Sequence, residues 1–376
     1  MRLAWSAWIP SPHGLRQLAP GIAIAAVLAV LAKAVAGEIS DGIAGGPAIP
    51  LSPVLCAVLF GMLWRNTIGV PAWSEQGLTW TMQALLRTGI ALVGLRLTLA
   101  GATSIAAIAL PIVVACISIA IVAGLVISRF MRVPRRLATL LALGTAVCGC
   151  TAVIALSPAI RARSVDTAFA VTCVVLFGCV AMLFYPWIAH HFFLTAPVYA
   201  GIFLGTSIHD TSQVIGSALI YSQQVNQPEA LAAASVAKLL RNLSIAVLIP
   251  TAAWLARDTK FFGDDNAEGS DAGPQSPAAR ALPFFVIGFI VLIVVRTLGD
   301  ATFTGATAAA WHEVVSIGQA SSELFLICGM TAVGLSVSFN QMWRIGWRPL
   351  AAGFLIATTV GGASLLLTLA TLRFMH

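Results

Sequence analysis

Long apolar runs separated by short polar stretches make up most of this chain of 376 residues. The runs are continuous for about 20 residues, the length at which an α-helix spans a bilayer. They do not alternate apolar and polar positions, as the strands of a transmembrane barrel do. The pattern therefore predicts an all-α, polytopic integral membrane protein and excludes a β-barrel. The apolar segments lie at 19–36, 47–64, 79–99, 103–128, 136–159, 165–189, 197–221, 231–255, 281–298, 312–338 and 349–371.

The composition agrees with a membrane protein. Hydrophobic residues make up 59% of the chain and charged residues 9%, whereas a soluble domain carries about 25% charged residues. The 32 glycines suit closely packed transmembrane helices. All seven cysteines lie inside apolar runs, so a disulfide framework is not expected. We predict one transmembrane transporter domain over residues 1–376.

The basic residues predict how the chain is oriented. The net charge is +7, and small basic groups at 129–136, 257–260 and 344–348 lie between apolar runs. Such groups are typical of the cytoplasmic ends of membrane helices. No basic tract with interleaved aromatic residues is present, which excludes nucleic acid as a partner. We expect a multi-pass membrane protein with a cytoplasmic N-terminus and a C-terminus on the opposite side of the membrane.

Two segments leave the number of crossings open. If segment 136–159 crosses the membrane fully, Arg161 and Arg163 face outward, and if it dips in and returns they lie inside. The same choice applies to segment 197–221. Nine crossings plus two broken or re-entrant segments fit the charges better than eleven full crossings. The sequence therefore predicts 9–11 transmembrane segments and does not decide how these two are arranged.

Two further stretches bear on the organisation of the chain. Residues 256–280 are polar and contain Gly, Ser and Pro, which predicts a flexible cytoplasmic loop between two halves. Residues 34–36 (Ala-Val-Ala) look like a signal-peptidase site, but Lys33 interrupts the apolar region just before them. We interpret residues 19–36 as the first membrane helix and leave cleavage of residues 1–36 open.

Internal similarity predicts an inverted-repeat-like design. Residues 89–98 and 329–338 share four of ten positions, and residues 144–154 resemble residues 205–215. Seven segment steps separate the first pair, so its two copies run in opposite directions. Opposed repeats around a site at the membrane midplane are typical of secondary transporters.

A few charged side chains lie well inside the apolar segments. They are Asp210 and Glu323 among the acidic residues, and Arg96, Lys238 and Arg241 among the basic ones. Each costs about 2.5–3.5 kcal/mol at the bilayer centre, so we expect each to face a partner or a polar cavity. Lys238 and Arg241 share a helix face and could neutralise a divalent anion; the alternative is a pair of anchors that snorkel to the membrane surface. Arg96 is a candidate third cation, and Glu323 is a candidate ion-pair partner of Arg96 or of Lys238.

Residues 205–213 form the strongest candidate site, because seven of these nine residues have polar side chains. A polar stretch at this depth is tolerated only against protein or water, which predicts a broken helix. The N-terminus of a half-helix is a natural anion site. His209 beside Asp210 could couple proton movement. The alternative is that these groups satisfy one another and only pack helices.

Residues 144–151 form the matching stretch, with two glycines and two threonines. They predict a substrate site lined by backbone, with packing alone as the alternative. Cys148 and Cys150 are not accompanied by further ligands at zinc-site spacing, so we expect no metal and no cofactor. The predicted substrate-binding residues are Thr145, Cys148, Gly149, Thr151, Gly205, Thr206, Ser207, Thr211, Ser212, Gln213, Lys238 and Arg241.

These residues resemble a known family, the YeiH-type sulfate exporters of bacterial inner membranes. The resemblance covers residues 50–371 and implies a location in the bacterial inner membrane, where the expected C-terminus is periplasmic. It implies a secondary transporter loosely related in fold to cation/proton antiporters and bile-acid symporters, with broken helices at the midplane. The family pattern has Ala-Ser where this chain has Cys150-Thr151, which we expect to affect fine substrate preference rather than mechanism. The resemblance is carried by Gly89 to Thr98, Cys148 to Val153, Gly205 to Val214, Lys238 with Arg241, Pro283 to Phe285, and Ala332 to Leu335.

We expect a secondary transporter that exports a small oxyanion such as sulfate or sulfite by alternating access. The alternatives are a cation/proton antiporter with Asp210 and Glu323 as ion ligands, and an organic sulfonate transporter. No phosphate-binding Gly-x-x-x-x-Gly-Lys-Ser/Thr motif is present, which argues against ATP as the energy source. Ser207 or Ser212 near His209 could imitate a hydrolase, but no oxyanion-hole motif accompanies them, so we expect no enzyme. The expected partners are a small inorganic or organic anion and membrane lipids, and a homodimer is left open.

Overall fold

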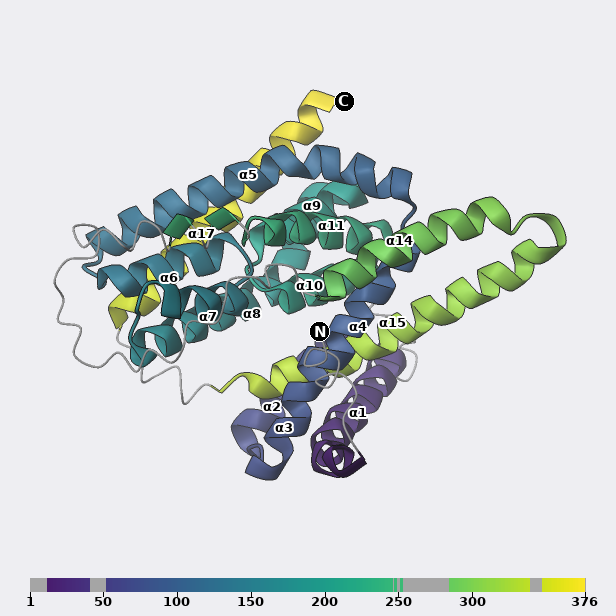
Figure 1. Cartoon of the computed structure of the whole chain (residues 1–376), viewed down its shortest axis with the longest axis horizontal. Coiled ribbons are helices and arrows are strands. Elements are labelled where there is room, and N and C mark those ends of the chain that lie inside the picture. The colour runs from purple at the N-terminus through teal and green to yellow at the C-terminus, as the bar shows by residue number, and fades with distance from the viewer. Residues whose placement is uncertain are drawn as a thin grey trace. The chain divides into compact units, whose positions relative to one another are not determined.

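The computed structural model describes residues 12–40, 52–245, 247–248, 251–252, 284–338 and 347–375. Within these ranges the chain is helical and contains no strand, which confirms the all-α prediction. The predicted loop at 256–280 lies outside the described residues. In chain order the main helices are α1 (Pro12–Ser40), α2 (Pro53–Thr67), α3 (Ala72–Trp80), α4 (Leu86–Leu92), α5 (Leu99–Phe130), α6 (Arg135–Ala146), α7 (Cys150–Ala159), α8 (Ser164–Phe193), α9 (Pro197–Ser207), α10 (Thr211–Val225), α11 (Glu229–Leu243), α14 (Phe284–Thr302), α15 (Ala308–Ser336) and α17 (Trp347–Met375) (Figure 1).

Six of these helices are long and apolar enough to cross a membrane. They confirm a polytopic membrane protein, whereas the orientation of the termini and the single chain-wide domain stay predictions. The six spans are Gln17–Ile39, Leu99–Phe130, Val165–Phe193, Phe285–Thr302, Ala308–Ser336 and Trp347–Phe374.

The chain divides into two compact units, each assembled from segments that are distant in sequence. The first unit comprises Met1–Leu99, Leu219–Pro228 and Ile287–Asn340. The second unit comprises Ala100–Ala218, Glu229–Val286 and Gln341–His376. Helix α10 therefore begins in the second unit and ends in the first.

Close backbone contacts hold the first unit together. Helix α2 packs against α15, α1 packs against α3, and α4 packs against α15. A Cβ added to Gly61 of α2 would lie 2.5 Å from the carbonyl oxygen of Thr331, and one added to Gly334 would lie 2.3 Å from that of Val58. Only glycine permits this approach, in the manner of small-residue contacts between membrane helices.

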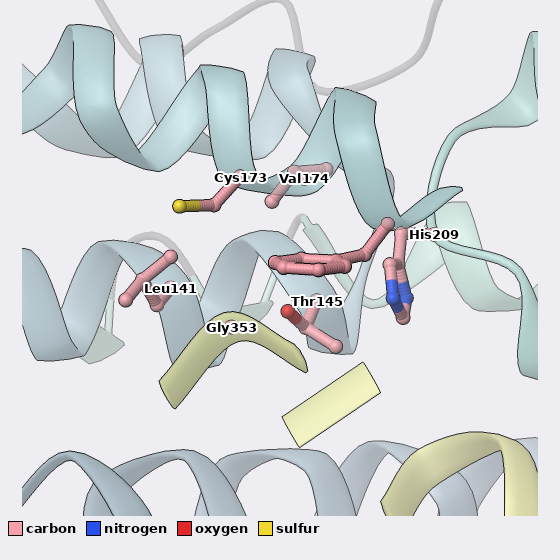
Figure 2. Close-up of a pocket in the computed structure, with 7 residues that line it drawn as sticks. Leu141, Thr145, Cys173, Val174, His209 and Gly353 are labelled. Atoms are coloured by element: carbon pink, nitrogen blue, oxygen red, sulfur yellow. The ribbon is translucent and has the colours of Figure 1, made fainter. Parts of the chain in front are cut away.

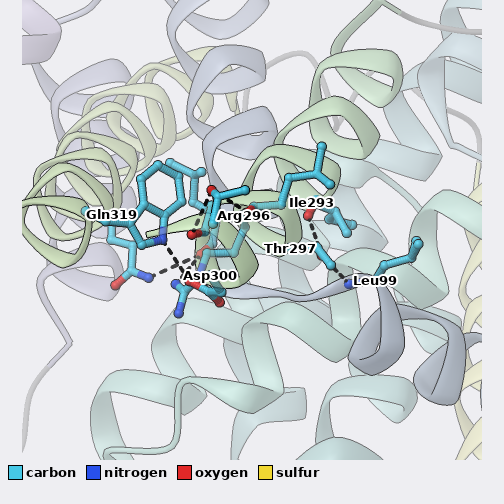
Figure 3. A network of polar contacts seen from close by, with 11 residues as sticks. Leu99, Ile293, Arg296, Thr297, Asp300 and Gln319 are labelled. Atoms are coloured by element: carbon cyan, nitrogen blue, oxygen red, sulfur yellow. Dashed lines mark hydrogen bonds and ion pairs between the residues drawn. The ribbon is translucent and has the colours of Figure 1, made fainter. Parts of the chain in front are cut away.

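The predicted segment 79–99 changes helix type twice. A π-helical turn at Thr81–Leu85 precedes α4, and a 3₁₀ turn, η3 (Val93–Arg96), follows it. Arg296 of α14 holds the end of η3, because its Nη1 donates to the Leu95 carbonyl at 3.0 Å while its Nε donates to the Asp300 carboxylate at 2.8 Å (Figure 3). Trp311 Nε1 also donates to Asp300, at 2.8 Å. This polar network ties η3, α14 and α15 to one another.

The second unit contains the breaks in the two segments whose arrangement the sequence left open. Helix α6 packs against α7 and α8, α9 packs against α11, and α17 packs against α8 and α9. Segment 136–159 is broken at residues 147–149, and segment 197–221 is broken at residues 208–210. Both breaks were predicted, and whether each segment crosses or re-enters the membrane stays open.

The predicted apolar segment 231–255 is interrupted at Ser244. Helix α11 ends at Leu243, and residues 245, 247–248 and 251–252 are again helical. Both the backbone N–H and the Oγ of Ser244 donate to the Arg241 carbonyl, the Oγ at 2.6 Å. A side-chain hydroxyl that binds the backbone in this way competes with the helical hydrogen-bond ladder, and the apolar pattern alone did not reveal it.

Candidate functional site

The two helix breaks have different local causes. Gly149 has φ +70° and ψ −125°, a conformation that favours glycine, and it directly precedes α7. In the other break, Ile208 is extended at φ −87° and ψ 142°, directly after the last residue of α9. Each break therefore leaves a helix C-terminus on one side and a helix N-terminus on the other, with backbone groups that the helices themselves do not pair.

The two breaks lie against each other within the second unit. A Cβ added to Gly149 would lie 3.2 Å from the Cα and 3.3 Å from the Cβ of Asp210. The stretches 144–151 and 205–213, singled out separately in the sequence, therefore form one site. The C-termini of α6 and α9 and the N-termini of α7 and α10 are its four helix ends.

Small residues bring α11 close to this site. A Cβ on Gly201 of α9 would lie 2.3 Å from the Ala230 carbonyl oxygen, and one on Gly205 would lie 2.7 Å from that of Ala234. The predicted binding residue Gly205 thus serves helix contact. Because α11 can approach α9 this closely, its longer side chains reach across to both breaks.

Lys238 of α11 bridges the two breaks through its ammonium group. Its Nζ donates to the carbonyl of Val147 at 3.1 Å, to that of Ile208 at 3.1 Å, and also to that of His209. The side chain is fully buried. The three protons of the ammonium group are matched by three carbonyl acceptors.

Arg241 makes the same kind of bridge one turn further along α11. Its Nε donates to the Ala146 carbonyl at 2.7 Å and its Nη1 to the Thr206 carbonyl at 2.8 Å. Nη1 also approaches the Ile208 carbonyl at 3.2 Å, and Nη2 donates to the Thr145 carbonyl. Arg241 is fully buried, so the alternative that these two cations are snorkelling anchors is wrong.

The two cations neutralise the carbonyl ends of two helices. A helix C-terminus carries roughly half a negative charge, and α6 and α9 both end against Lys238 and Arg241. Without such donors, these buried carbonyls would be unsatisfied. The described hydrogen bonds of the Lys238 and Arg241 side chains are thus all made to backbone carbonyls.

Asp210 lies at the amide ends of the other two helices, α7 and α10. Its Oδ1 accepts a hydrogen bond from the Ser212 N–H at 2.9 Å, which caps α10. The carboxylate also interacts electrostatically with Lys238. Asp210, Thr211 and Ser212 are half-buried and Thr151 is exposed, whereas the carbonyl side of the site is buried. The amide side is therefore the accessible one.

His209 faces a narrow hollow instead (Figure 2). Its side chain is 1% exposed, and neither ring nitrogen has a hydrogen-bond partner of good geometry among the described residues, although the ring lies close to the Thr145 backbone. In this conformation the hollow does not admit even a water molecule. Its lining consists of Leu141, Thr145, Cys173, Val174, Phe177, His209 and Gly353.

Other predicted residues connect the breaks to their surroundings. The Thr206 Oγ1 lies 2.7 Å from the Ser364 Oγ of α17, and Gln213 Nε2 donates to the Val175 carbonyl of α8 at 3.0 Å. Ser207 Oγ and Gln213 Oε1 are buried without a partner among the described residues. Cys148 is buried, and no group of three His, Cys, Asp or Glu residues in the described ranges could hold a metal ion.

Sequence reasoning missed several contributors. Asn242 Nδ2 donates to the Thr211 Oγ1 at 3.3 Å, and Ser364 supports Thr206. Asn242 directly follows Arg241 in an apolar segment, which was a usable signal. No signal pointed to Ser364, a single hydroxyl in a long apolar run.

Arg96 and Glu323 belong to the first unit, and no direct ion pair forms between them in the described structure.

The fold and this site define a polytopic helical membrane protein built around two broken helices. Residues 20–353 match the family model described as "Conserved hypothetical protein 698", and the chain belongs to this family. It is 31% identical to a UPF0324 membrane protein of Ralstonia nicotianae, over 84% of this chain and 85% of the relative. A UPF0324 membrane protein of Nitratidesulfovibrio vulgaris is 27% identical over 95% and 93% of the two chains.

Proposed function

We propose that this protein is a secondary transporter that exports a small oxyanion, such as sulfate or sulfite, across the bacterial inner membrane by proton-coupled alternating access. The supporting observation is the meeting of two broken helices whose carbonyl ends are bound by Lys238 and Arg241. Broken helices around a polar centre are typical of ion-coupled carriers. Such a carrier moves its substrate without forming or breaking covalent bonds, so no enzyme activity is part of the proposal.

The charges at the site favour an anion. Lys238 counts as positively charged because its Nζ donates to three carbonyls, which uses all three protons of an ammonium group. Arg241 adds a second positive charge, and Asp210 contributes one negative charge. The two carbonyl ends carry roughly −0.5 each and the two amide ends roughly +0.5 each, so the helix ends cancel. The sum is about +1, which favours an anion over a cation.

The amide side is where we place the substrate. The N-termini of α7 and α10 present backbone N–H groups, which bind oxyanions at helix starts. Thr151, Thr211 and Ser212 add hydroxyl groups there, and Gly149 lets the two helix starts approach. Lys238 and Arg241 act through their charge from the buried side rather than by touching the anion.

Of the two candidate proton carriers, Asp210 is the better placed. His209 is buried beside Lys238, which binds its carbonyl, and beside Arg241, which binds the neighbouring Thr145 carbonyl. The imidazole is buried, and neither ring nitrogen has a described hydrogen-bond partner that could pass it a proton. Asp210 is half-buried on the accessible side. The resemblance to YeiH-type sulfate exporters supports the sulfate or sulfite class.

Flux measurements in liposomes test this proposal. Labelled sulfate and sulfite are followed with and without a pH gradient, using the wild-type protein and Asp210→Asn. We expect anion flux in the wild type that responds to the gradient, and flux in Asp210→Asn that does not. No flux of either anion by folded wild-type protein would overturn the substrate assignment, and sodium- or potassium-dependent proton movement in the same vesicles would favour the cation antiporter.

A further inference from the structure

A second polar cluster lies in the first unit. Ser52, the N-cap of α2, donates its Oγ proton to the Gln223 Oε1 at 2.6 Å. Gln223, near the end of α10, in turn donates its Nε2 to the Glu323 Oε1 at 2.7 Å. Three helices are thus joined by two hydrogen bonds that run toward the carboxylate of Glu323 in the middle of α15.

Arg96 is the cation of this cluster. It ends η3, and the following residue, Leu97, is extended at φ −123° and ψ 142°. The turn η3 packs against α15, where Gln319 Nε2 donates to the Leu95 carbonyl at 3.4 Å. Glu323 lies one turn further along α15 and acts on Arg96 electrostatically, but the two side chains form no direct ion pair in the described structure. The Arg96 Nε is buried and has no hydrogen-bond partner among the described residues. Its charge is therefore balanced by Glu323 while a buried donor stays unused.

An unused buried donor is costly unless an acceptor arrives. An oxyanion supplies such acceptors, since guanidinium groups bind oxyanions through short, charge-assisted hydrogen bonds. The ionised Glu323 opposes this binding, because its negative charge already balances Arg96 and repels a second anion. Protonation of Glu323 removes that repulsion and leaves the Arg96 charge unbalanced.

We propose that Arg96 and Glu323 form a proton-gated oxyanion site, in which Arg96 binds the anion only when Glu323 carries a proton. The proposal rests on the proposed function, because it takes an oxyanion as the substrate. Proton binding at Glu323 and anion binding at Arg96 then strengthen each other by the same factor. One proton accompanies one anion, and the anion binds more tightly as the pH falls.

Charged groups other than Arg96 and Glu323 also lie on α15 and on the helices around it. Arg65 of α2 is paired with Glu75 of α3 at 3.6 Å. Lys33 and Glu38 of α1 are exposed, as is Glu313 on α15 itself. Arg296 and Asp300 of α14 pair with each other at 2.8 Å. Among the residues whose side chains the structure describes, the charged or titratable groups that remain on these elements are Arg87 of α4 and the exposed His312 of α15.

Sulfate binding to the purified full-length protein tests the proposal by titration calorimetry across mildly acidic to mildly alkaline pH. Sulfate is the probe because it stays a dianion over this range, so any pH dependence belongs to the protein. We expect wild-type affinity to fall about tenfold per pH unit once Glu323 ionises, as linkage to one proton requires. Glu323→Gln should lose the part of this pH dependence that Glu323 supplies and should bind sulfate in alkaline solution about as tightly as the wild type does in acid. Asp210→Asn, measured beside it, reports the contribution of the other proposed proton carrier.

Two further variants make the test specific. Arg96→Gln should lose about tenfold or more in sulfate affinity at low pH, equivalent to about 1.4 kcal/mol, and Arg96→Lys should recover part of it. Glu313→Gln, which removes an exposed carboxylate from the same helix, should keep the wild-type pH dependence. Thermal unfolding of each variant confirms that it is folded.

The outcomes separate this site from the proposed function. If the wild type binds and transports sulfate but Glu323→Gln keeps its pH dependence, or Arg96→Gln keeps its affinity, the proton-gated site is wrong and the transporter stands. If folded wild-type protein neither binds nor transports sulfate at any pH tested, both are overturned.

Discussion

The two units hold an arginine of an apolar segment in opposite ways. In the second unit, Arg241 makes four hydrogen bonds to backbone carbonyls and is fully buried. In the first unit, Arg96 is balanced by Glu323 at a distance, and its buried Nε has no partner among the described residues. Arginines that look alike in sequence thus differ in role: one completes the backbone of the site, and the other retains capacity for a ligand.

Arg241→Gln should have the largest effect on stability. Arg241→Gln removes the donors for the Thr145, Ala146 and Thr206 carbonyls, which are buried. We expect a loss of about 3–5 kcal/mol in the free energy of unfolding, measured by thermal unfolding in detergent. Glu75→Gln, which breaks the surface pair with Arg65, should lose at most about 1 kcal/mol. If Arg241→Gln and Glu75→Gln lost the same free energy of unfolding, the assigned role of Arg241 would be contradicted.

Lys238→Met should have the next largest effect. It keeps the length of the side chain but leaves the Val147 and His209 carbonyls without their donor. We expect a loss of about 2–4 kcal/mol in the free energy of unfolding, together with loss of sulfate flux in liposomes. A stable variant with full flux would show that neither the charge nor the hydrogen bonds of Lys238 are needed.

Gly149→Ala tests the break itself. The left-handed backbone at Gly149 and the 3.2 Å approach to Asp210 both disfavour a Cβ. We expect a loss of about 1–3 kcal/mol in the free energy of unfolding and slower flux. Gly37→Ala on α1 is the matched control, since a Cβ there meets nothing within 4 Å. If the two glycine variants were equally stable, the break would not need this conformation.

Arg96→Gln should have the smallest effect on stability, within about 1 kcal/mol, because its buried Nε has no hydrogen bond to lose. Thermal unfolding measures this change beside the loss of sulfate affinity expected above. Unfolding as severe as that of Arg241→Gln would make Arg96 a structural residue and remove the contrast between the two units.

Much of this architecture could be predicted from the sequence. The apolar periodicity placed the long helices, and the polar stretch at 205–213 placed a break, because side-chain chemistry at that depth has few structural explanations. The partners of Lys238 and Arg241 could not be predicted. Every residue has a backbone carbonyl, so the sequence does not mark which carbonyls need a side-chain donor. The partners are the carbonyls of Thr145, Ala146, Val147, Thr206, Ile208 and His209.

The division into two units could not be predicted from the sequence either. The pairing of Gln223 with Glu323 joins residues 100 positions apart, and Ser52 lies 171 positions from Gln223. Apolar patterns show which face of a helix is buried, but they do not show which distant helix covers it. The end of α11 at Leu243 was missed for a related reason, because one serine hydroxyl decided it.

The order of the elements along the chain has a consequence for biogenesis. Helices α6 and α9 leave the ribosome before α11, which carries the donors for the carbonyls at both breaks. Until α11 enters the membrane, those carbonyls have no internal partner, and lipid cannot provide one. The two broken segments therefore reach their final depth only together with α11, so a nascent chain stopped before residue 229 should hold them in a hydrated, protease-sensitive state.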